Sequence, residues 1–404
     1  MIPPREVAGR LALAVLSSAL ALAAVEAAAR FVVHRAEARP HTTRGSIIRF
    51  DPALGWAKPP GDQAWLHRPE YDVHLAVNAH GLRGPDRGHE KPPGTGRVLL
   101  LGDSFTEGFT VREEGTLRAV LESLLAAPGC GRWEVINAGT LGYSTDQEYL
   151  FFATEGRRYQ PDVVVVLFFY NDLNGNVTTG LKPSFTVDDG RLALHDSPLP
   201  PPAGGPWTRR PEPRAFRVRP WRGSMALRLL GDRAAAGNPS LHRALARLGL
   251  VEPPRVEPLP ADFWPFGPGH RQEVGEMWKR TGAILGALKA ASEEAKARLV
   301  VLAVPDETEI NPRAAALTCQ RYGLGRRWWD AARVVRRLKA VCDTLRIPVV
   351  LPHGALQEAE SRGLSPYFPE DGHWTETGHR IGAEELARGL IRMGLVTCPA
   401  APTP

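Results

Sequence analysis

A serine that could act as a nucleophile follows an apolar run near residue 100. Four large aliphatic residues, Val98 to Leu101, suit a strand buried on both faces, and Gly102 allows a tight turn into a helix. Ser104 would then lie at the carboxyl end of a parallel strand, where an open α/β sheet forms its ligand crevice. The alternative is that Ser104 only caps the following helix, with Glu107 completing a capping box.

Three other polar segments follow predicted strands or precede a helix, so they could supply partners for Ser104. They are the glycine-rich loop Asn137 to Gly142, the stretch Tyr170 to Asp172 after a long apolar run, and the turn Asp371 to His373. A serine hydroxyl is a weak nucleophile unless a base lies within hydrogen-bond reach, and the base needs a third group to orient it. These segments therefore make Ser104 a candidate for acyl-transfer chemistry.

Alternating strands and helices must position these groups. Apolar runs predict five strands, at Arg97–Gly102, Trp133–Ala138, Val163–Tyr170, Arg298–Val304 and Pro348–Leu351. Amphipathic stretches predict helices between them, at Leu117–Leu125, Gln272–Ala297 and Trp329–Leu345. Such alternation indicates right-handed crossovers and a mainly parallel sheet with helices on both faces, which is an α/β fold.

Composition excludes several classes of protein. The chain has 404 residues, of which 43% are hydrophobic and 23% charged, so it can bury a large core and is not disordered in bulk. The net charge of +6 comes from scattered basic residues without a nucleic-acid motif, so no nucleic-acid partner is expected. The four cysteines lack zinc spacing, and no His/Asp/Glu cluster has metal spacing, so we expect no metal and no other cofactor.

The N-terminus carries a targeting signal. The segment from Leu11 to Val33 is largely apolar and has about the 20 residues that a helix needs to cross a bilayer. We therefore expect residues 1–39 to form a single-pass signal anchor, with the catalytic part outside the cytoplasm. A cleaved secretory signal peptide is the alternative, and it would also export the rest of the chain. In an exported protein one or two disulfides could form among the four cysteines.

The remaining chain divides into a lead-in and a large domain. Residues 40–96 read as a turn-rich, extended lead-in that we expect to be structural, and residues 97–396 as the catalytic domain. A proline-rich insertion at 173–270 interrupts this domain, with a predicted hairpin at Ser184–Leu194 and a short helix at Ser240–Leu250.

The aromatic run at the end of the insertion has two interpretations. Loops over the carboxyl ends of strands often form lids that set specificity. Phe263 to Phe266 would then either line an acyl or sugar subsite or anchor the long loop to the core.

Four short motifs in a fixed order give the chain a family resemblance. They are G-D-S at 102–104, N-A-G-T-L-G at 137–142, N-D at 171–172 and D-G-H at 371–373. In this order the chain resembles the SGNH (GDSL-type) hydrolase superfamily over about residues 95–395, and its N-terminus is similar to that of membrane-anchored bacterial members. The resemblance implies a three-layer, flavodoxin-like fold with a mainly parallel five-stranded sheet.

The resemblance also implies roles for individual residues. Ser104 would be the nucleophile and His373 the base that takes its proton. The oxyanion would be held by the backbone N–H groups of Ser104 and Gly142 and by the side-chain amide of Asn171. Gly142 is preferred because the family's glycine falls late in this loop, and Gly139 would be a turn residue with unusual dihedral angles.

The third member of the triad is less certain from the pattern. The usual family spacing puts the acid at Glu370, three residues before the histidine, whereas Asp371 lies two before it. The D-x-H spacing resembles a branch that includes alginate-type and peptidoglycan-type O-acetyltransferases and their esterase relatives. We favour Asp371, because residues two apart in an extended backbone project to the same side. Some family members use only a Ser–His dyad.

The resulting expectation is a serine ester hydrolase. It would remove an acyl group, acetyl in the first place, from a cell-surface glycan or lipid through an acyl-enzyme. One alternative is an O-acyltransferase, which uses the same acyl-enzyme and differs only in the acceptor. The other, from a different functional class, is a non-catalytic glycan-binding protein on the same fold.

Overall fold

The computed structural model describes residues 4–37, 43–44, 47–201, 224–251, 257–325 and 327–397 of the chain. These residues form two compact units. One combines residues 1–40 with 204–257, and the other combines residues 41–203 with 258–404. The lead-in therefore belongs to the same unit as the predicted catalytic domain.

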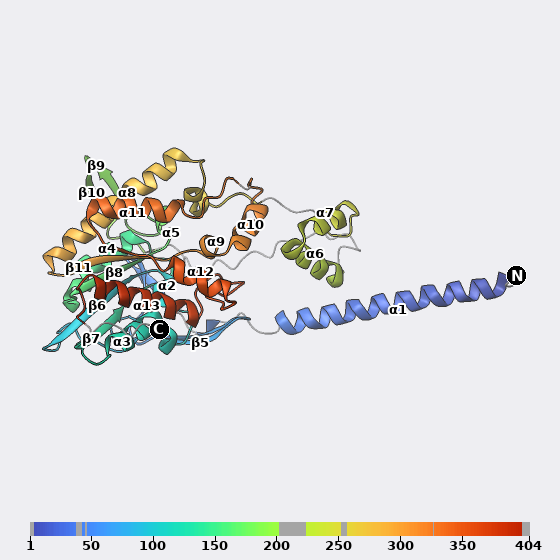
Figure 1. Cartoon of the computed structure of the whole chain (residues 1–404), viewed down its shortest axis with the longest axis horizontal. Helices are drawn as coiled ribbons and strands as arrows, with labels where there is room; N and C mark the ends of the chain where they lie inside the picture. The colour runs from blue at the N-terminus through green and yellow to red at the C-terminus, as the bar shows by residue number, and fades with distance from the viewer. Residues whose placement is uncertain are drawn as a thin grey trace. The chain divides into compact units, whose positions relative to one another are not determined.

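The larger unit is built on a five-stranded parallel sheet, as the sequence predicts (Figure 1). Its strands are β6 (Thr95–Gly102), β7 (Arg132–Asn137), β8 (Val163–Phe168), β11 (Arg298–Ala303) and β12 (Val349–Val350). The order across the sheet is β12-β11-β8-β6-β7. Counted along the chain this is the 2-1-3-4-5 order of flavodoxin-like folds.

Alternating side chains of the strands face two separate cores. Val98 and Leu100 of β6 pack with one set of helices, whereas Leu99 and Leu101 pack with the other. The first core includes α3 (Leu117–Leu125), α12 (His353–Ser361) and α13 (Glu376–Arg392). The second includes α4 (Thr145–Thr154), α8 (Arg271–Glu294) and α11 (Arg333–Leu345). The predicted three-layer arrangement is confirmed.

The strand order places a ligand crevice beside β6. After β6 the chain enters β7 on one side, and it later enters β8 on the other side. Such a reversal opens a crevice at the carboxyl ends of the strands. Two short helices begin there, α2 (Ser104–Glu107) after β6 and α5 (Asn171–Gly175) after β8.

Short antiparallel strands make up the lead-in. The strands β1 (Thr43–Arg44), β4 (Gln63–His67) and β5 (Asp72–Ala76) form one sheet. The strands β2 (Arg49–Asp51) and β3 (Gly55–Ala57) form another. Side chains of β4 and β5 alternate between buried and exposed, which is the pattern of a sheet packed on one face. The predicted extended segment is thus a folded part of the larger unit.

The insertion contains both predicted elements and one that was missed. The hairpin is present as β9 (Ser184–Asp188) and β10 (Arg191–His195), and the short helix is α7 (Pro239–Arg247). A preceding helix, α6 (Met225–Gly237), was not predicted; it is capped by Ser224, whose side chain accepts from Leu227 N–H. Residues 202–223 lie outside the described residues.

Several shorter helices complete the connections. They are the 3₁₀ turns η1 (Glu113–Gly115), η2 (Gly156–Tyr159) and η5 (Ala261–Phe266) and the helices α9 (Glu307–Ile310) and α10 (Pro312–Arg321).

The N-terminal segment forms one helix, α1 (Pro4–Glu37). Among the residues that the structure describes, no helix is both long and apolar enough to cross a membrane. The predicted transmembrane helix is therefore not supported. Two charges interrupt its apolar run, because Glu26 and Arg30 pair at 2.8 Å inside it. Glu26 also accepts hydrogen bonds from Ser224 and from the N–H of Ala226 at the start of α6.

Candidate active site

Ser104 lies at the first position of α2, directly after the sheet. Gly102 makes this turn feasible, because a Cβ there would lie 1.9 Å from Oγ1 of Thr106. Asp103 is the N-cap of α2, and its carboxylate accepts the N–H of Phe105 at 2.9 Å. The interpretation of Ser104 as a simple helix cap is therefore wrong, and its hydroxyl is left for another partner.

That partner is His373. Oγ of Ser104 lies 2.8 Å from Nε2 of His373, although 269 residues separate the two in the chain. The imidazole lies against two aromatic rings, with ring centroids 4.8 Å from Phe105 and 4.9 Å from Phe109. The fold thus gives the serine a base within proton-transfer distance.

Asp371, rather than Glu370, faces the histidine. Oδ1 of Asp371 lies 2.6 Å from Nδ1 of His373, whereas Glu370 is exposed. The other oxygen, Oδ2, accepts a hydrogen bond from the hydroxyl of Tyr71 at 2.9 Å. Burial alone would raise the pKa of Asp371, but the hydrogen bonds from His373 and Tyr71 outweigh it and hold that pKa below its usual value. The carboxylate therefore stays charged near neutral pH.

The lead-in also holds the turn that carries this acid. Glu70 accepts the backbone N–H of Glu370 at 3.0 Å and that of Asp371 at 2.8 Å. Together with Tyr71, it links the lead-in to the loop before α13. The expectation that the lead-in only supports the fold from a distance needs correction, because its side chains directly contact the acid.

A second group of lead-in residues supports the glycine-rich loop. The ammonium of Lys58 donates to the carbonyl of Gly139 and lies 3.6 Å from the carboxylate of Glu107. Glu107 in turn accepts the N–H of Leu141 at 2.9 Å, and Nε1 of Trp56 donates to the Leu141 carbonyl at 2.9 Å. Burial lowers the pKa of Lys58 although Glu107 favours its charged form. These contacts fix the loop that contains Gly142.

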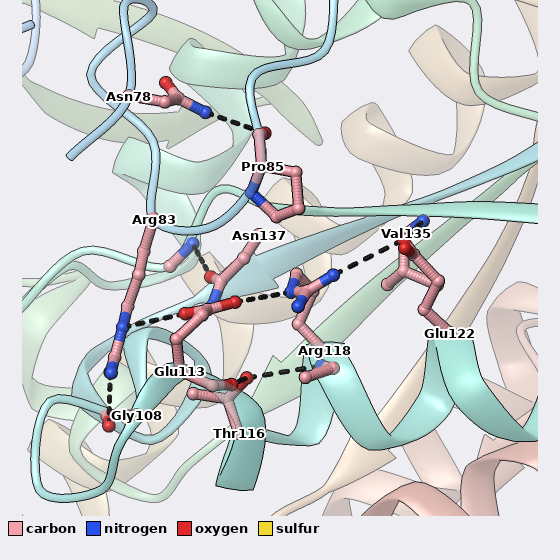
Figure 2. Close-up of polar contacts among 12 residues, drawn as sticks. Asn78, Arg83, Pro85, Gly108, Glu113, Thr116, Arg118, Glu122, Val135 and Asn137 are labelled. Carbon is pink, nitrogen blue, oxygen red and sulfur yellow. Dashed lines mark hydrogen bonds and ion pairs between the residues drawn. The ribbon is translucent and has the colours of Figure 1, made fainter. Parts of the chain in front are cut away.

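Arg83 ties down the chain that follows Ser104. Its guanidinium donates to the carbonyls of Glu107, Gly108 and Val111 and pairs with Glu113 at 3.0 Å. Figure 2 shows this arginine reaching Gly108 and Glu113, with Glu113 extending the contacts toward α3. Arg83 is only 2% exposed, so its charge is satisfied almost wholly by these groups.

Three donors that could hold an oxyanion remain available at the carboxyl edge. Nδ2 of Asn171 donates to Oδ2 of Asp103 at 3.1 Å, which leaves its second amide hydrogen unused by the described residues. Within those residues, the backbone N–H groups of Ser104 and Gly142 make no hydrogen bond to the protein. Gly142 has φ +73°, a conformation that favours glycine. The oxyanion-hole role of all three stays a prediction.

Gly139 differs from its sequence interpretation. Its φ is not positive, and a Cβ there would lie 2.3 Å from the backbone nitrogen of Glu107. Close packing of the loop on α2, rather than an unusual dihedral angle, therefore requires glycine at this position.

Two buried aspartates act as the sequence analysis expects. Asp103 supports the turn and orients Asn171, as described above. Asp172 accepts the N–H of Phe169 at 3.2 Å and so fixes the start of α5. Burial raises the pKa of both carboxyls.

His379 and the aromatic run of the insertion are packing groups. His379 is 1% exposed and packs edge-on against Trp374, and burial lowers its pKa to about 3. Phe266 is fully buried and stacks on Trp329 at 4.6 Å, so it anchors the insertion to the core. Phe263 is partly buried and stacks on Tyr170, the residue before Asn171. The subsite interpretation of the run therefore rests on Phe263 rather than on Phe266.

The cysteines behave in two ways. Cys130 is disulfide-bonded. Cys319 and Cys342 are free and buried, and burial raises the pKa of both thiols. The prediction that Cys342 is a small buried hydrophobe is confirmed.

Similarity to known proteins agrees with this geometry. Three solved structures illustrate the fold match. A lipase/acylhydrolase from Enterococcus faecalis is 15% identical, with 76% of this chain and 100% of that chain covered and a TM-score of 0.36. An acetyl xylan esterase is 12% identical, with 73% and 100% covered and a TM-score of 0.39. A mutant acetyl-xylooligosaccharide esterase from Geobacillus is 15% identical, with 74% and 95% covered and a TM-score of 0.36.

The family assignment rests on the sequence itself. No curated protein matches the chain significantly. The model of the GDSL-like lipase/acylhydrolase family matches residues 100–381, a range that runs from the end of β6 into α13 and includes both Ser104 and His373. The chain therefore belongs to the GDSL-like lipase/acylhydrolase family and is a carboxylic ester hydrolase.

Proposed function

We propose that Ser104, His373 and Asp371 form the catalytic triad of this esterase. The observation that carries the proposal is the continuous set of contacts from Ser104 Oγ to His373 Nε2 and from His373 Nδ1 to Asp371 Oδ1, at 2.8 and 2.6 Å. A base that contacts the nucleophile and an acid that orients the base are the two requirements for activating a serine.

Acylation follows from this arrangement. As Ser104 Oγ attacks the ester carbonyl, its proton passes to Nε2 of His373, and the negative charge of Asp371 stabilises the imidazolium. The carbonyl oxygen becomes an oxyanion, which the N–H groups of Ser104 and Gly142 and the amide of Asn171 would hold. The imidazolium then donates its proton to the alcohol oxygen as the ester bond breaks, which leaves the acyl group on Ser104.

Deacylation repeats these steps with water. His373 takes a proton from the water as its oxygen attacks the acyl-enzyme, and it returns the proton to Ser104 as the carboxylic acid leaves. An O-acyltransferase would replace the water with a sugar hydroxyl. The two-residue spacing between Asp371 and His373, which the structure realises as a direct contact, is the observation that keeps this alternative open.

The proposed substrate is an acylated cell-surface glycan or lipid, with acetyl as the acyl group. Ser104 is only 6% exposed, and Phe105 and Phe109 lie against its base, so limited room at the nucleophile favours a small acyl group. A role as a non-catalytic glycan-binding protein is disfavoured, because binding alone does not require a serine, a histidine and an aspartate in mutual contact.

We place the enzyme outside the cytoplasm as part of the same proposal. The disulfide of Cys130 supports this location, because disulfides persist in oxidising compartments. Protease treatment of intact cells that produce the full chain would test it, with digestion expected without lysis. Protection until lysis would contradict it.

Chain-length preference and acceptor choice test the chemistry. The full chain should hydrolyse p-nitrophenyl acetate faster than the butyrate or octanoate, and His373→Ala should lower kcat/KM by about a thousandfold or more. His379→Ala, a second histidine change outside the triad, should retain activity when folded. A preference for octanoate would contradict an acetyl substrate, and equal activity in His373→Ala would contradict the proposed base.

Adding acceptors distinguishes the two enzymes. With p-nitrophenyl acetate as donor, an esterase releases acetate at a rate that polysaccharide does not change. A transferase forms acetylated polysaccharide at the expense of free acetate, which product analysis by mass spectrometry would detect.

A further inference from the structure

Two histidines and a glutamate from distant parts of the chain meet at the far edge of the central sheet. His80, His89 and Glu155 each offer one ligand atom, and these atoms all lie within 4.8 Å of one another. His89 precedes the amino end of β6 and Glu155 precedes the amino end of β8, whereas Ser104 follows the carboxyl end of β6. The cluster is therefore separate from the catalytic triad.

The geometry of the cluster suits a small cation. Nε2 of His89 lies 2.6 Å from Oε1 of Glu155, and the two imidazole rings are 5.1 Å apart. Ligand atoms of a tetrahedral zinc site lie roughly 3.3 Å apart, at zinc–ligand distances of about 2.0–2.2 Å. Side-chain rotations of about 1 Å would therefore bring the three atoms to coordination distance. Asp86, whose Oδ1 is 3.5 Å from Nε2 of His80, stands beside the cluster as a fourth oxygen ligand.

Buried groups hold the backbone of this cluster in place. The side chain of Arg97, which is 1% exposed, donates to the carbonyls of His89 and Tyr159 at 2.9 and 2.8 Å. The loop of His80 is fixed separately, because the side chain of Asn78 accepts the N–H of His80 at 2.9 Å. The segments that carry the ligands are thus positioned without any cation.

An unpaired hydroxyl gives a second, independent indication. Tyr159 is fully buried, and its ring centroid lies 4.6 Å from that of His89 and 5.9 Å from that of His80. Its hydroxyl has no hydrogen-bond partner among the described residues, which is costly for a buried polar group. Burial and the neighbouring carboxylates of Glu155 and Asp86 raise the pKa of Tyr159, so the hydroxyl keeps its proton and could donate to a metal-bound water or carboxylate.

The carboxylate of Glu155 is oriented as a ligand would be. Its second oxygen, Oε2, accepts from Arg158 at 2.8 Å, which leaves Oε1 directed to the histidines. Burial would raise the pKa of Glu155, but hydrogen bonds from His89 and Arg158 hold it below its usual value, so the group is charged at neutral pH. Hydrogen bonds of this kind to ligating carboxylates are typical of metal sites.

We propose that His80, His89 and Glu155 bind a divalent transition-metal ion of the zinc type. Imidazole nitrogen with carboxylate oxygen is a ligand set that Zn²⁺ accepts readily. The ion would join the lead-in, which carries both histidines, to η2 and so to the central sheet. Because the same lead-in supplies Arg83 and Tyr71 to the active site, the expected role of the ion is to stabilise the folded enzyme rather than to take part in ester chemistry.

Metal binding by the full chain tests this proposal. The protein, prepared without a histidine tag and stripped with chelator, should bind one equivalent of Zn²⁺ at pH 7.5 by calorimetry. Zinc at a hundred times its Kd should raise Tm by about 3 °C or more. His89→Ala and the size-matched Glu155→Gln should each weaken binding by at least tenfold and abolish the rise in Tm.

A histidine elsewhere in the lead-in provides the matched control. His74 is exposed and pairs with Gln63 at 2.9 Å, so His74→Ala should bind zinc like the wild type. The absence of a zinc equivalent in the folded wild type would overturn the proposal. Unchanged binding in Glu155→Gln would also overturn it, and this variant decides the result if His89→Ala does not fold.

Discussion

The sheet and the lead-in support the active site by different physical means. The sheet places Ser104 and Asn171 through apolar burial, because the strands before them are covered on both faces. The lead-in instead uses polar side chains that reach across the chain, with Tyr71 on the triad acid and Lys58 on the glycine-rich loop. Apolar packing fixes where the reacting groups stand, and the polar contacts fix how the loops around them are oriented.

This comparison predicts a graded response to mutation. Changes to groups at the sheet edge should remove steps of the reaction, whereas changes to lead-in groups should only loosen groups that are otherwise intact. The effects below run from the largest to the smallest.

The acid of the triad should show the largest difference between neighbours. Asp371→Asn removes the charge that stabilises the imidazolium, so kcat/KM should fall by about 10³–10⁴. Glu370→Gln, one residue away and exposed, should stay within about twofold of wild type. Steady-state hydrolysis of p-nitrophenyl acetate measures both. A fall below tenfold in Asp371→Asn would mean that a Ser–His dyad suffices.

The oxyanion donor at the end of β8 should come next. Asn171→Ala removes a donor that acts only on the developing oxyanion, so kcat should fall by about 10²–10³ with little change in KM. Asn174→Ala, three residues later in α5, should leave kcat nearly unchanged. If Asn171→Ala changed KM alone, the amide would bind substrate rather than stabilise the transition state.

A lead-in residue should have a smaller effect. Tyr71→Phe removes one hydrogen bond to Asp371, worth about 1 kcal/mol, so kcat/KM should fall by about fivefold. The same change at Tyr149, which packs on Phe185, should have no effect on kcat/KM. A loss in Tyr71→Phe as large as that in Asp371→Asn would contradict the division between placing and orienting groups.

The smallest effect on catalysis should come from His379, which instead controls acid stability. Its pKa is about 3 in the folded enzyme against 6.5 for an ordinary histidine. As pH falls from 7 to 5, the unfolded chain takes up this proton and the folded chain does not, so folding loses about 2 kcal/mol. His379→Gln should remove this loss, as urea unfolding at both pH values would measure. An unchanged pH dependence would show that other groups cause the acid sensitivity.

The sequence predicted the sheet well because its strands are buried on both faces. Runs such as Val163–Phe168 contain only apolar residues, and their length and β-branched content identify them as strands. Ser104, His373 and Asp371 could be proposed because each lies in a short motif next to such an element. The contact between Asp371 and His373 agrees with the two-residue spacing, although its catalytic role stays a prediction.

The lead-in contacts could not be predicted in the same way. Tyr71 meets Asp371 across 300 residues of sequence, and nothing in the turn-rich lead-in distinguishes Tyr71 from a surface tyrosine. The cluster of His80, His89 and Glu155 was missed for a similar reason, because 66 residues separate His89 from Glu155. The transmembrane interpretation relied on mean apolarity, which gave too little weight to the charges of Glu26 and Arg30.

Covalent trapping of Ser104 tests the central claim most directly. The full chain treated with a fluorophosphonate should gain the mass of one adduct, and peptide mapping should place it on Ser104. Labelling should disappear in Ser104→Ala and become much slower in His373→Ala, because the thiol-free hydroxyl needs its base. A folded wild type that takes no label, or a Ser104→Ala variant that still does, would contradict the proposed nucleophile.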